Sequence, residues 1–258
     1  MTTTRPDDSA GSGQEVREPV RLAMWSGPRN ISTALMRSWE NRPDTVVIDE
    51  PLYAYYLVET GLDHPVREQI IAAGPTDWRA AVADLILTGG AGADVYYQKH
   101  MAQHLIPDLP LDWIIGLHNV MLIRDPFEVA ASYVRSRANV VADDLGAVQQ
   151  TRLYDYLAAA GVDPPVIDAT DFLKAPEPYL RWLCAWAGVP FTPAMLSWPP
   201  GPRASDGIWA PYWYAAVENS TGFEPWRARQ IQVSGPALAA ATESWPHYER
   251  LAEHRLRL

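Results

Sequence analysis

Short apolar runs alternate along the chain with longer segments in which apolar residues recur every three or four positions. The short runs end at glycine, proline or charged residues, which is typical of strands, and the longer segments have the period of helices. Five strands are predicted, over residues 21–26, 45–48, 94–99, 119–123 and 165–168. Helices are predicted over residues 31–39, 77–88, 143–160, 177–187 and 236–255, with one more starting near Pro126. This alternation predicts an α/β fold of three layers, with a mostly parallel central sheet flanked by helices.

Polar residues lie at the ends of four of the five predicted strands, at positions that a parallel sheet would bring together. They lie at residues 27–29, 49–50, 99–100 and 124–125. In open α/β sheets, ligands bind beyond the carboxyl ends of the strands, at one edge of the sheet. The sequence therefore predicts one binding site built from these four clusters.

The two ends of the chain differ from this α/β pattern. Residues 1–18 are rich in small polar residues and proline, and are predicted to form a disordered tail before one domain over residues 19–258. Within that domain, residues 197–235 are rich in proline and aromatic residues. This segment, and a second aromatic stretch at residues 53–56, would either line a ligand pocket, form a lid, or belong to the core.

Composition and charge restrict the class of protein. Apolar residues make up 48% of the chain and charged residues 20%, which fits a globular protein with a sizeable core. The 31 acidic residues outnumber the 21 basic ones, so a nucleic-acid partner, which needs a basic surface, is not expected. No apolar run approaches the roughly 20 residues of a membrane-spanning helix, and the polar N-terminal residues do not resemble a signal peptide.

The single cysteine, Cys184, cannot form a disulfide within the chain. It lies between Trp182 and Trp186 in a predicted helix, so we expect a buried packing residue and not a catalytic thiol. A cytoplasmic location follows as the default expectation, since a reducing compartment keeps thiols free. The sequence carries no signal of an oligomeric state.

A first candidate anion site lies in the turn between the first predicted strand and its helix, from Ser26 to Thr33. A helix N-terminus offers unpaired N–H groups and about half a positive charge, which favours phosphate or sulfate groups. Arg29 adds a permanently charged planar guanidinium group to this turn. The alternative is a capped helix that follows a turn and binds nothing.

A second candidate anion site pairs Arg124, which follows a predicted strand, with Ser132, about two helical turns further on. The guanidinium and hydroxyl groups would together hold a phosphate group. The alternative is that Arg124 pairs with Asp125 or Glu128 and that Ser132 is a small packing residue.

Together the two sites resemble the PAPS-dependent sulfotransferases, where PAPS is 3′-phosphoadenosine 5′-phosphosulfate. In that family a loop of the form P-[KR]-S-G-[ST]-T grips the 5′-phosphosulfate, and R-[DN]-P with a serine eight residues after the arginine grips the 3′-phosphate. The first motif is matched by Pro28, Arg29, Asn30, Ile31, Ser32 and Thr33. The second is matched by Arg124, Asp125, Pro126 and Ser132. The resemblance covers residues 21–190 and implies a P-loop-like sulfotransferase fold, with PAPS as the sulfuryl donor and PAP as the product.

The chain departs from the first motif at Asn30 and Ile31, which replace serine and glycine. If the glycine of the family has a positive φ, a β-branched isoleucine is a poor substitute. The loop would then be reshaped, or Asn30 would adopt the left-handed conformation.

Two residues are candidates for the base that accepts the proton of the attacking group. Glu50 is preferred, because some carbohydrate sulfotransferases carry a catalytic glutamate in a similar E-P-L setting. His100 is the second candidate: it resembles the histidine of the K-T-H motif of cytosolic sulfotransferases but lies one position early, which points it to the other face of a strand. The remaining alternatives are an acceptor that needs no base, and a Glu50 that merely pairs with Arg29 or Arg124.

The resemblance implies transfer of a sulfuryl group from PAPS to a hydroxyl or amine group of a small-molecule acceptor. Arg29 and Lys99 would stabilise the charge that develops on the transferring group. Arg227 and Arg229, in the late aromatic segment, would close over the nucleotide, although no motif supports their assignment. Neither a metal ion nor a membrane partner is implied.

Two other functions remain open at this point. The apolar residues before Asp49 resemble the strand that holds Mg²⁺ in ATP-dependent kinases, yet the chain lacks the G-x-x-x-x-G-K-[ST] loop of those enzymes. The unusual Ile31 and the displaced His100 leave open a non-catalytic protein that binds PAP without turnover.

Overall fold

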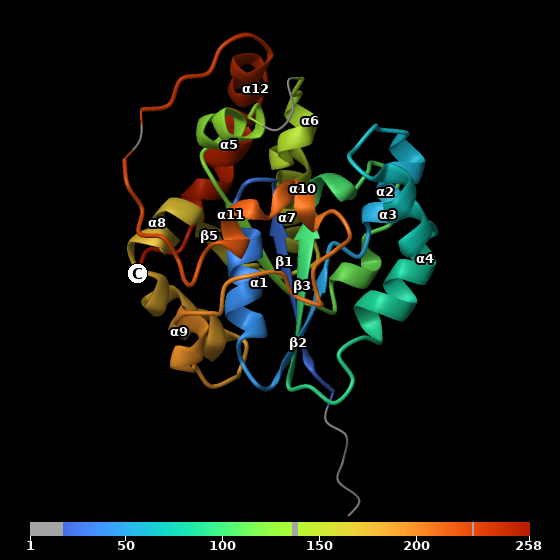
Figure 1. Ribbon diagram of the computed structural model, residues 1–258, viewed down its shortest axis with the longest axis vertical. Coiled ribbons are helices and arrows are strands. Elements are labelled where there is room, and N and C mark those ends of the chain that lie inside the picture. Colours follow the sequence, from blue (N-terminus) through green and yellow to red (C-terminus); the bar gives the residue numbers. More distant parts are fainter. Residues whose placement is uncertain (1–17, 136–138, 229) are drawn as a thin grey trace, which may run out of the picture.

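The computed structural model describes residues 18–135, 139–228 and 230–258. Its centre is a sheet of five parallel strands in the order β2-β3-β1-β4-β5 (Figure 1). The strands are β1 (Val20–Ser26), β2 (Thr45–Asp49), β3 (Val95–Met101), β4 (His118–Ile123) and β5 (Val166–Asp168). The predicted parallel α/β fold and its five strands are therefore confirmed.

Alternation along the strands produces two cores, one on each face of the sheet. Leu22 and Met24 of β1 pack with helices on one face, and Ala23 and Trp25 pack with helices on the other. The first face is covered by α1 (Ser32–Glu40), α8 (Ala169–Lys174) and α9 (Pro176–Trp186). The second is covered by α7 (Ala147–Ala159) and α12 (Gly235–Glu253). In Figure 1, α1 passes in front of the strands.

The other helices lie at the edges and ends of the sheet. They are α2 (Tyr53–Thr60), α3 (Arg67–Ala73), α4 (Trp78–Ala80), α5 (Pro126–Tyr133), α6 (Ala142–Leu145), α10 (Ala210–Trp213) and α11 (Ala215–Glu218). Four shorter or irregular helices are the π-helix η1 (Ala81–Leu87) and the 3₁₀ turns η2 (Ala102–His104), η3 (Asp112–Ile114) and η4 (Pro193–Leu196).

Two predicted helices differ in detail. The helix predicted over residues 77–88 is α-helical only at its start and continues as the π-helix η1. The single helix predicted over residues 143–160 is two helices, because Gly146, with a φ of 76°, ends α6 and starts α7 in another direction. The left-handed conformation at Gly146 stops the helical hydrogen-bond ladder there.

The third strand is longer than predicted, which changes the setting of Lys99 and His100. The expectation that the strand ends at Lys99 is wrong, because β3 runs on to Met101, which pairs with Ser26 of β1. Their polar character suggested a strand end, yet both side chains are buried and have partners. Successive residues of a strand point to opposite faces, so Lys99 and His100 lie in different surroundings.

The turn after β1 requires a glycine, which gives a first prediction. A Cβ atom at Gly27 would lie 2.2 Å from the carbonyl oxygen of Leu145, the last residue of α6. Gly27→Ala should therefore lower the free energy of unfolding by about 1–3 kcal/mol, measured by urea denaturation. Gly116→Ala is the matched control, since nothing lies within 4 Å of a Cβ there. Equal stability of the two variants would contradict the close contact.

Candidate functional site

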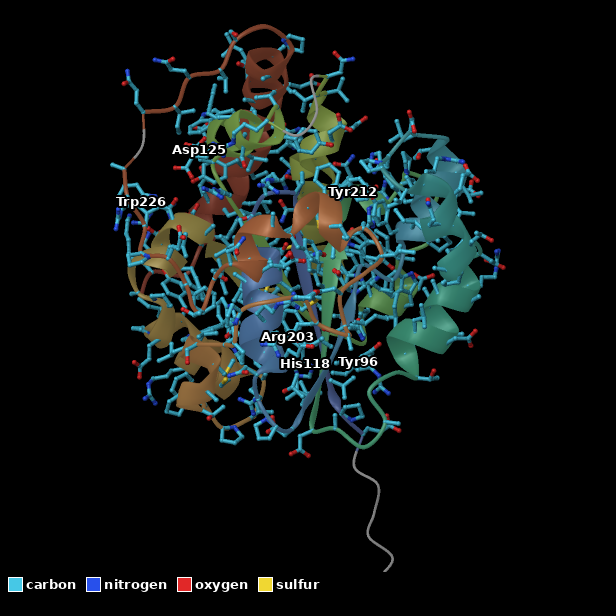
Figure 2. The ribbon with its side chains drawn as sticks, viewed as in Figure 1. Tyr96, His118, Asp125, Arg203, Tyr212 and Trp226 are labelled. Atoms are coloured by element: carbon cyan, nitrogen blue, oxygen red, sulfur yellow. The ribbon has the colours of Figure 1, made fainter. Side chains whose placement is uncertain are left out.

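A cavity of about 640 Å³ opens at the carboxyl edge of the sheet. It is lined by the turn before α1, the ends of β2 and β3, the middle of α5 and residues 213–232. In Figure 2, Tyr96 and His118 lie in the lower part and mark the amino ends of β3 and β4. Tyr212 and Trp226 lie in the upper part, toward the carboxyl ends of the strands. The cavity therefore lies where the strand order changes direction around β1, as expected for a ligand site in this kind of sheet.

The turn from Pro28 to Thr33 lines the cavity in a strained conformation. Arg29 and Ile31 have φ values of 55° and 51°, whereas Asn30 has no positive φ, so the expectation that Asn30 adopts the left-handed conformation is wrong. Asn30 instead donates a hydrogen bond of 2.6 Å to the carbonyl oxygen of Leu122, which pins the turn to β4. A β-branched residue at positive φ costs about 1–3 kcal/mol, and it persists because the surrounding structure fixes it.

Three arginine side chains gather at this end of the cavity. Arg29 Nε and Arg135 Nη2 both donate to Ser132 Oγ, at 3.1 and 3.2 Å, and Arg124 Nη1 donates to the carbonyl oxygen of Arg29 at 2.8 Å. Burial and the charges of Arg135 and Arg124 lower the pKa of Arg29. Like charges held this close together favour an anion between them.

Arg124 forms the ion pair that one of the two interpretations of the sequence expected, in which it pairs with a nearby carboxylate. It pairs with Glu128 at 2.8 Å, and it also reaches the turn of the first motif through the carbonyl oxygen of Arg29. Asp125 is not its partner, because the Asp125 carboxylate caps α5 by accepting from the backbone N–H of Phe127 at 2.7 Å. The two motifs are therefore in direct contact.

The cavity is also lined by a buried lysine, Lys99, that lies between two carboxylates. Lys99 Nζ lies 2.8 Å from Asp49 Oδ1 and 2.5 Å from Glu50 Oε1, and it donates to the hydroxyl of Tyr214 at 2.8 Å. The partner of Glu50 is therefore Lys99, and not Arg29 or Arg124. Lys99 is 1% exposed, so its charge is confined to this group of residues.

Glu50 has the electrostatic setting of a group that exchanges protons near neutral pH. Burial, aided by the negative charge of Asp49 and opposed by Lys99, raises the pKa of Glu50 to about 7. Its side chain lines the cavity, whereas Asp49 is not among the lining residues. A carboxyl group with a pKa near the working pH is suited to general base catalysis.

His100, the second candidate base, lies away from the cavity. Its ring stacks on Trp25 at 4.1 Å, and its Nε2 atom lies 3.1 Å from Gln98 Oε1. Burial and the charge of Lys99 lower the pKa of His100 to about 3, so the ring is neutral. It is not among the residues that line the cavity.

Two lining residues were not assigned from the sequence. His104, interpreted there as an ordinary surface or packing residue, has its Nε2 atom 3.9 Å from Glu50 Oε2 and its ring stacked on Tyr53 at 4.8 Å. Burial lowers the pKa of His104 well below its usual value. Only their positions in the chain could have identified these two residues. His104 lies just beyond the carboxyl end of β3, and Arg135 lies one helical turn after Ser132.

The aromatic segments divide between cavity and core. Tyr53, Trp213 and Tyr214 line the cavity, while Tyr55 and Trp209 belong to the hydrophobic clusters of the interior. Arg227 lines the cavity as well, and Arg229 lies outside the described residues.

Cys184 is buried in the core of the first face, where burial raises the pKa of its thiol. Across the three described ranges of the chain, no group of three or more His, Cys, Asp and Glu side chains is arranged to hold a metal ion. In the same ranges, no helix is long and apolar enough to cross a membrane.

Comparison with known families agrees with this arrangement. Residues 20–253 match a family model described as a sulfotransferase domain. The chain belongs to this family of sulfotransferase domains. The resemblance drawn from the two motifs is thereby confirmed.

Solved structures share the fold of this sulfotransferase domain at low sequence identity. The sulfotransferase domain of the Synechococcus PCC 7002 olefin synthase has a TM-score of 0.57 and 17% identity, covering 91% of this chain and 94% of that one. The sulfotransferase domain from the curacin biosynthetic pathway gives the same TM-score and identity, covering 94% of this chain and all of that one. A sulfotransferase from Alicyclobacillus acidocaldarius has a TM-score of 0.53 and 15% identity, covering 93% of this chain and 98% of that one.

Two curated proteins of Arabidopsis thaliana are similar to the chain in sequence. They are named branched-chain-amino-acid aminotransferase-like proteins 1 and 2, and are 38% and 36% identical over 91% and 89% of this chain. The chain spans about 40% of the length of these relatives.

Proposed function

We propose that this chain transfers a sulfuryl group from PAPS to a hydroxyl or amine group of a small-molecule acceptor and releases PAP. The observation that carries the proposal is that one cavity is lined both by three linked arginines and by Glu50 with Lys99. The arginine cluster suits a nucleotide with two phosphate positions, and Glu50 suits removal of a proton from the acceptor.

The arginine cluster is where PAPS would bind. Arg124 and Ser132 would hold the 3′-phosphate, with Arg29 and Arg135 beside them, since both donate to the Ser132 hydroxyl. The phosphosulfate would lie along residues 28–33. The first turn of α1 has no capping side chain and no acidic residue, and its residues line the cavity, so its N–H groups are available to an anion.

The chemical step requires one proton acceptor and several positive charges. An acceptor oxygen or nitrogen would attack the sulfur atom, its proton would pass to the Glu50 carboxylate, and the bond from sulfur to the bridging oxygen of PAPS would break. The electron pair of that bond would leave with PAP. Arg29 and Lys99 would stabilise the negative charge on the transferring group and on the departing phosphate.

Titration calorimetry with PAP tests the donor site. We expect wild-type protein to bind PAP, and Arg124→Ala and Arg135→Ala to bind it roughly 10- to 100-fold more weakly, because each loses a charge-assisted contact of about 1.5–3 kcal/mol. Arg181→Ala, which removes a surface arginine paired with Glu177, is the control and should bind as wild type. Unchanged PAP affinity in the folded Arg124→Ala and Arg135→Ala proteins would contradict the assignment.

Titration with ATP and Mg²⁺ tests the first alternative function, and a turnover assay with PAPS tests the second. An ATP-dependent enzyme would bind ATP with Mg²⁺ and would need Asp49 as a metal ligand, but Asp49 is bound to Lys99 and Tyr214 and does not line the cavity. A non-catalytic protein would bind PAP and turn over no acceptor with PAPS.

A further inference from the structure

Asp49 and Glu50 share the ammonium group of Lys99 unequally. Asp49 accepts three hydrogen bonds: from Lys99 Nζ at 2.8 Å, from the hydroxyl of Tyr214 at 2.6 Å and from the backbone N–H of Gly207 at 3.1 Å. In the described part of the chain, Glu50 accepts one, from Lys99 Nζ at 2.5 Å. Asp49 is therefore the more fully hydrogen-bonded of the two carboxylates, and Glu50 keeps an oxygen without a strong donor.

The backbone brings these two neighbouring side chains to the same ammonium group. Adjacent residues of a regular strand point to opposite faces, yet Asp49 ends β2 and Glu50 has a φ of 45°, which turns its side chain back toward Lys99. A left-handed conformation is unfavourable for a glutamate, and such strain clusters at functional sites. The backbone N–H of Glu50 donates to the carbonyl oxygen of Lys99 at 2.9 Å, which holds the turn in place.

We infer that Asp49 is a positioning residue for Glu50: it holds the Lys99 ammonium group from outside the cavity, so that Glu50 shares that charge and keeps a proton-accepting oxygen inside it. This inference rests on the proposed role of Glu50 as the base. Tyr214, from the aromatic segment, belongs to the same hydrogen-bond network. Its hydroxyl accepts from Lys99, donates to Asp49 and accepts a hydrogen bond of 3.1 Å from Trp209 Nε1.

The charges around Glu50 explain why Asp49 matters. Lys99 lies on β3, Asp49 on β2 and Tyr214 directly after α10, and the rings of His104 from η2 and Tyr53 from α2 line the same end of the cavity. Buried His104 is neutral, so the charges that act on Glu50 are one positive ammonium and one negative carboxylate. Two carboxylates with one ammonium in a buried place take up a proton readily, and Glu50, which accepts fewer hydrogen bonds than Asp49, is the carboxylate suited to hold it.

Two substitutions should shift the titration of Glu50 in opposite directions. Asp49→Asn removes the competing negative charge, so Lys99 serves Glu50 alone, and we expect the pKa of Glu50 to fall by about one unit or more. Tyr214→Phe removes a donor from Asp49 and keeps both negative charges, so the pair binds its proton more tightly and Glu50 titrates at higher pH. A loss of packing alone would not shift the Glu50 titration in opposite directions in the two variants.

Carbon-13 NMR titration of the side-chain carboxyl groups measures this without any substrate. The Glu50 resonance is assigned by its loss in Glu50→Gln, and wild type, Asp49→Asn and Tyr214→Phe are then titrated, after thermal melting has shown that each is folded. Asp163→Asn, which changes an exposed aspartate, is the control and should leave the Glu50 titration unchanged. A Glu50 titration in Asp49→Asn that stays at the wild-type value, or moves up, would overturn the inference. If Asp49→Asn does not fold, a Glu50 titration in Tyr214→Phe that stays in place or moves to lower pH would overturn the inference.

The pH dependence of turnover supplies the second measurement. In Asp49→Asn, the acidic limb of the rate profile with PAPS and an acceptor should move to lower pH together with the NMR titration. If the wild-type protein turns over no acceptor, the proposed function fails, but the NMR titration still decides the role of Asp49. If turnover occurs and the limb stays in place, the positioning role fails and the sulfotransferase function stands.

Discussion

Replacing Glu50 with glutamine should slow sulfuryl transfer by about 100-fold or more, while PAP affinity remains close to that of the wild type. Glutamine keeps the shape of the side chain and cannot accept the acceptor's proton. PAP affinity is expected to persist because the partner of Glu50 is Lys99 and not one of the three arginines proposed to hold PAP. The measurement is the steady-state rate with PAPS and an acceptor, alongside calorimetry with PAP.

Glu59→Gln, on the exposed side of α2, is the matched control and should retain the wild-type rate. A full rate in Glu50→Gln would remove Glu50 as the base and would leave an acceptor that needs none. Loss of PAP binding together with activity would show that the substitution disturbs the cavity as a whole.

The same role fixes the direction of the pH dependence. A base works only when ionised, and burial raises the pKa of Glu50 to about 7, so the wild-type rate should rise with pH and level off above that value. At lower pH the carboxyl group already holds a proton and cannot take another. A rate that is constant from pH 5 to pH 8, with PAP binding also constant, would contradict this assignment of the base.

Removing the carboxylate of Asp206 should lower the free energy of unfolding by about 3–5 kcal/mol, because it leaves a buried charge without its partner. Arg37 of α1 makes two close contacts with Asp206, at 2.6 and 2.7 Å, and the two side chains are 1% and 5% exposed. Glu40 lies 3.5 Å from the same guanidinium group and takes up part of its charge, so we expect the lower end of the range. Urea denaturation of Asp206→Ala measures the loss.

Glu177→Ala provides the comparison for Asp206, because it breaks a surface pair with Arg181 in which both side chains are about half exposed. Such a pair contributes about 0–1 kcal/mol. If Asp206→Ala cost no more than Glu177→Ala, the buried pair would not be what attaches the aromatic segment to α1.

The parts of the fold that depend on local periodicity could be predicted from the sequence. Strands such as residues 119–123 alternate with amphipathic helices, and that pattern requires no knowledge of distant contacts. The end of β3 could not be predicted in this way. In the sequence, Lys99 and His100 indicate a strand end that faces a binding site, and only their partners, Asp49 and Trp25, make them acceptable inside a strand.

The residues of the candidate site likewise fall into two groups, those that local spacing identifies and those that only distant contacts bring together. Arg124 and Ser132 could be found because eight residues separate them within one turn and helix. Tyr214 could not be connected with Lys99, because 115 residues separate the two in the sequence. The left-handed conformation of Ile31 was likewise unpredictable, because the contacts that stabilise it, such as the bond from Asn30 to Leu122, are tertiary.

One wall of the cavity comes from residues 213–232, whereas Glu50 and Lys99 are fixed by the strands. Under the proposed function, substitutions in this wall would change acceptor preference without moving the proton-accepting group. Val217, Ser220 and Phe223 line the cavity and are suitable positions for such variation. Tyr214 is the position in this wall to keep constant, since a library that varied it would change acceptor shape and base strength at once.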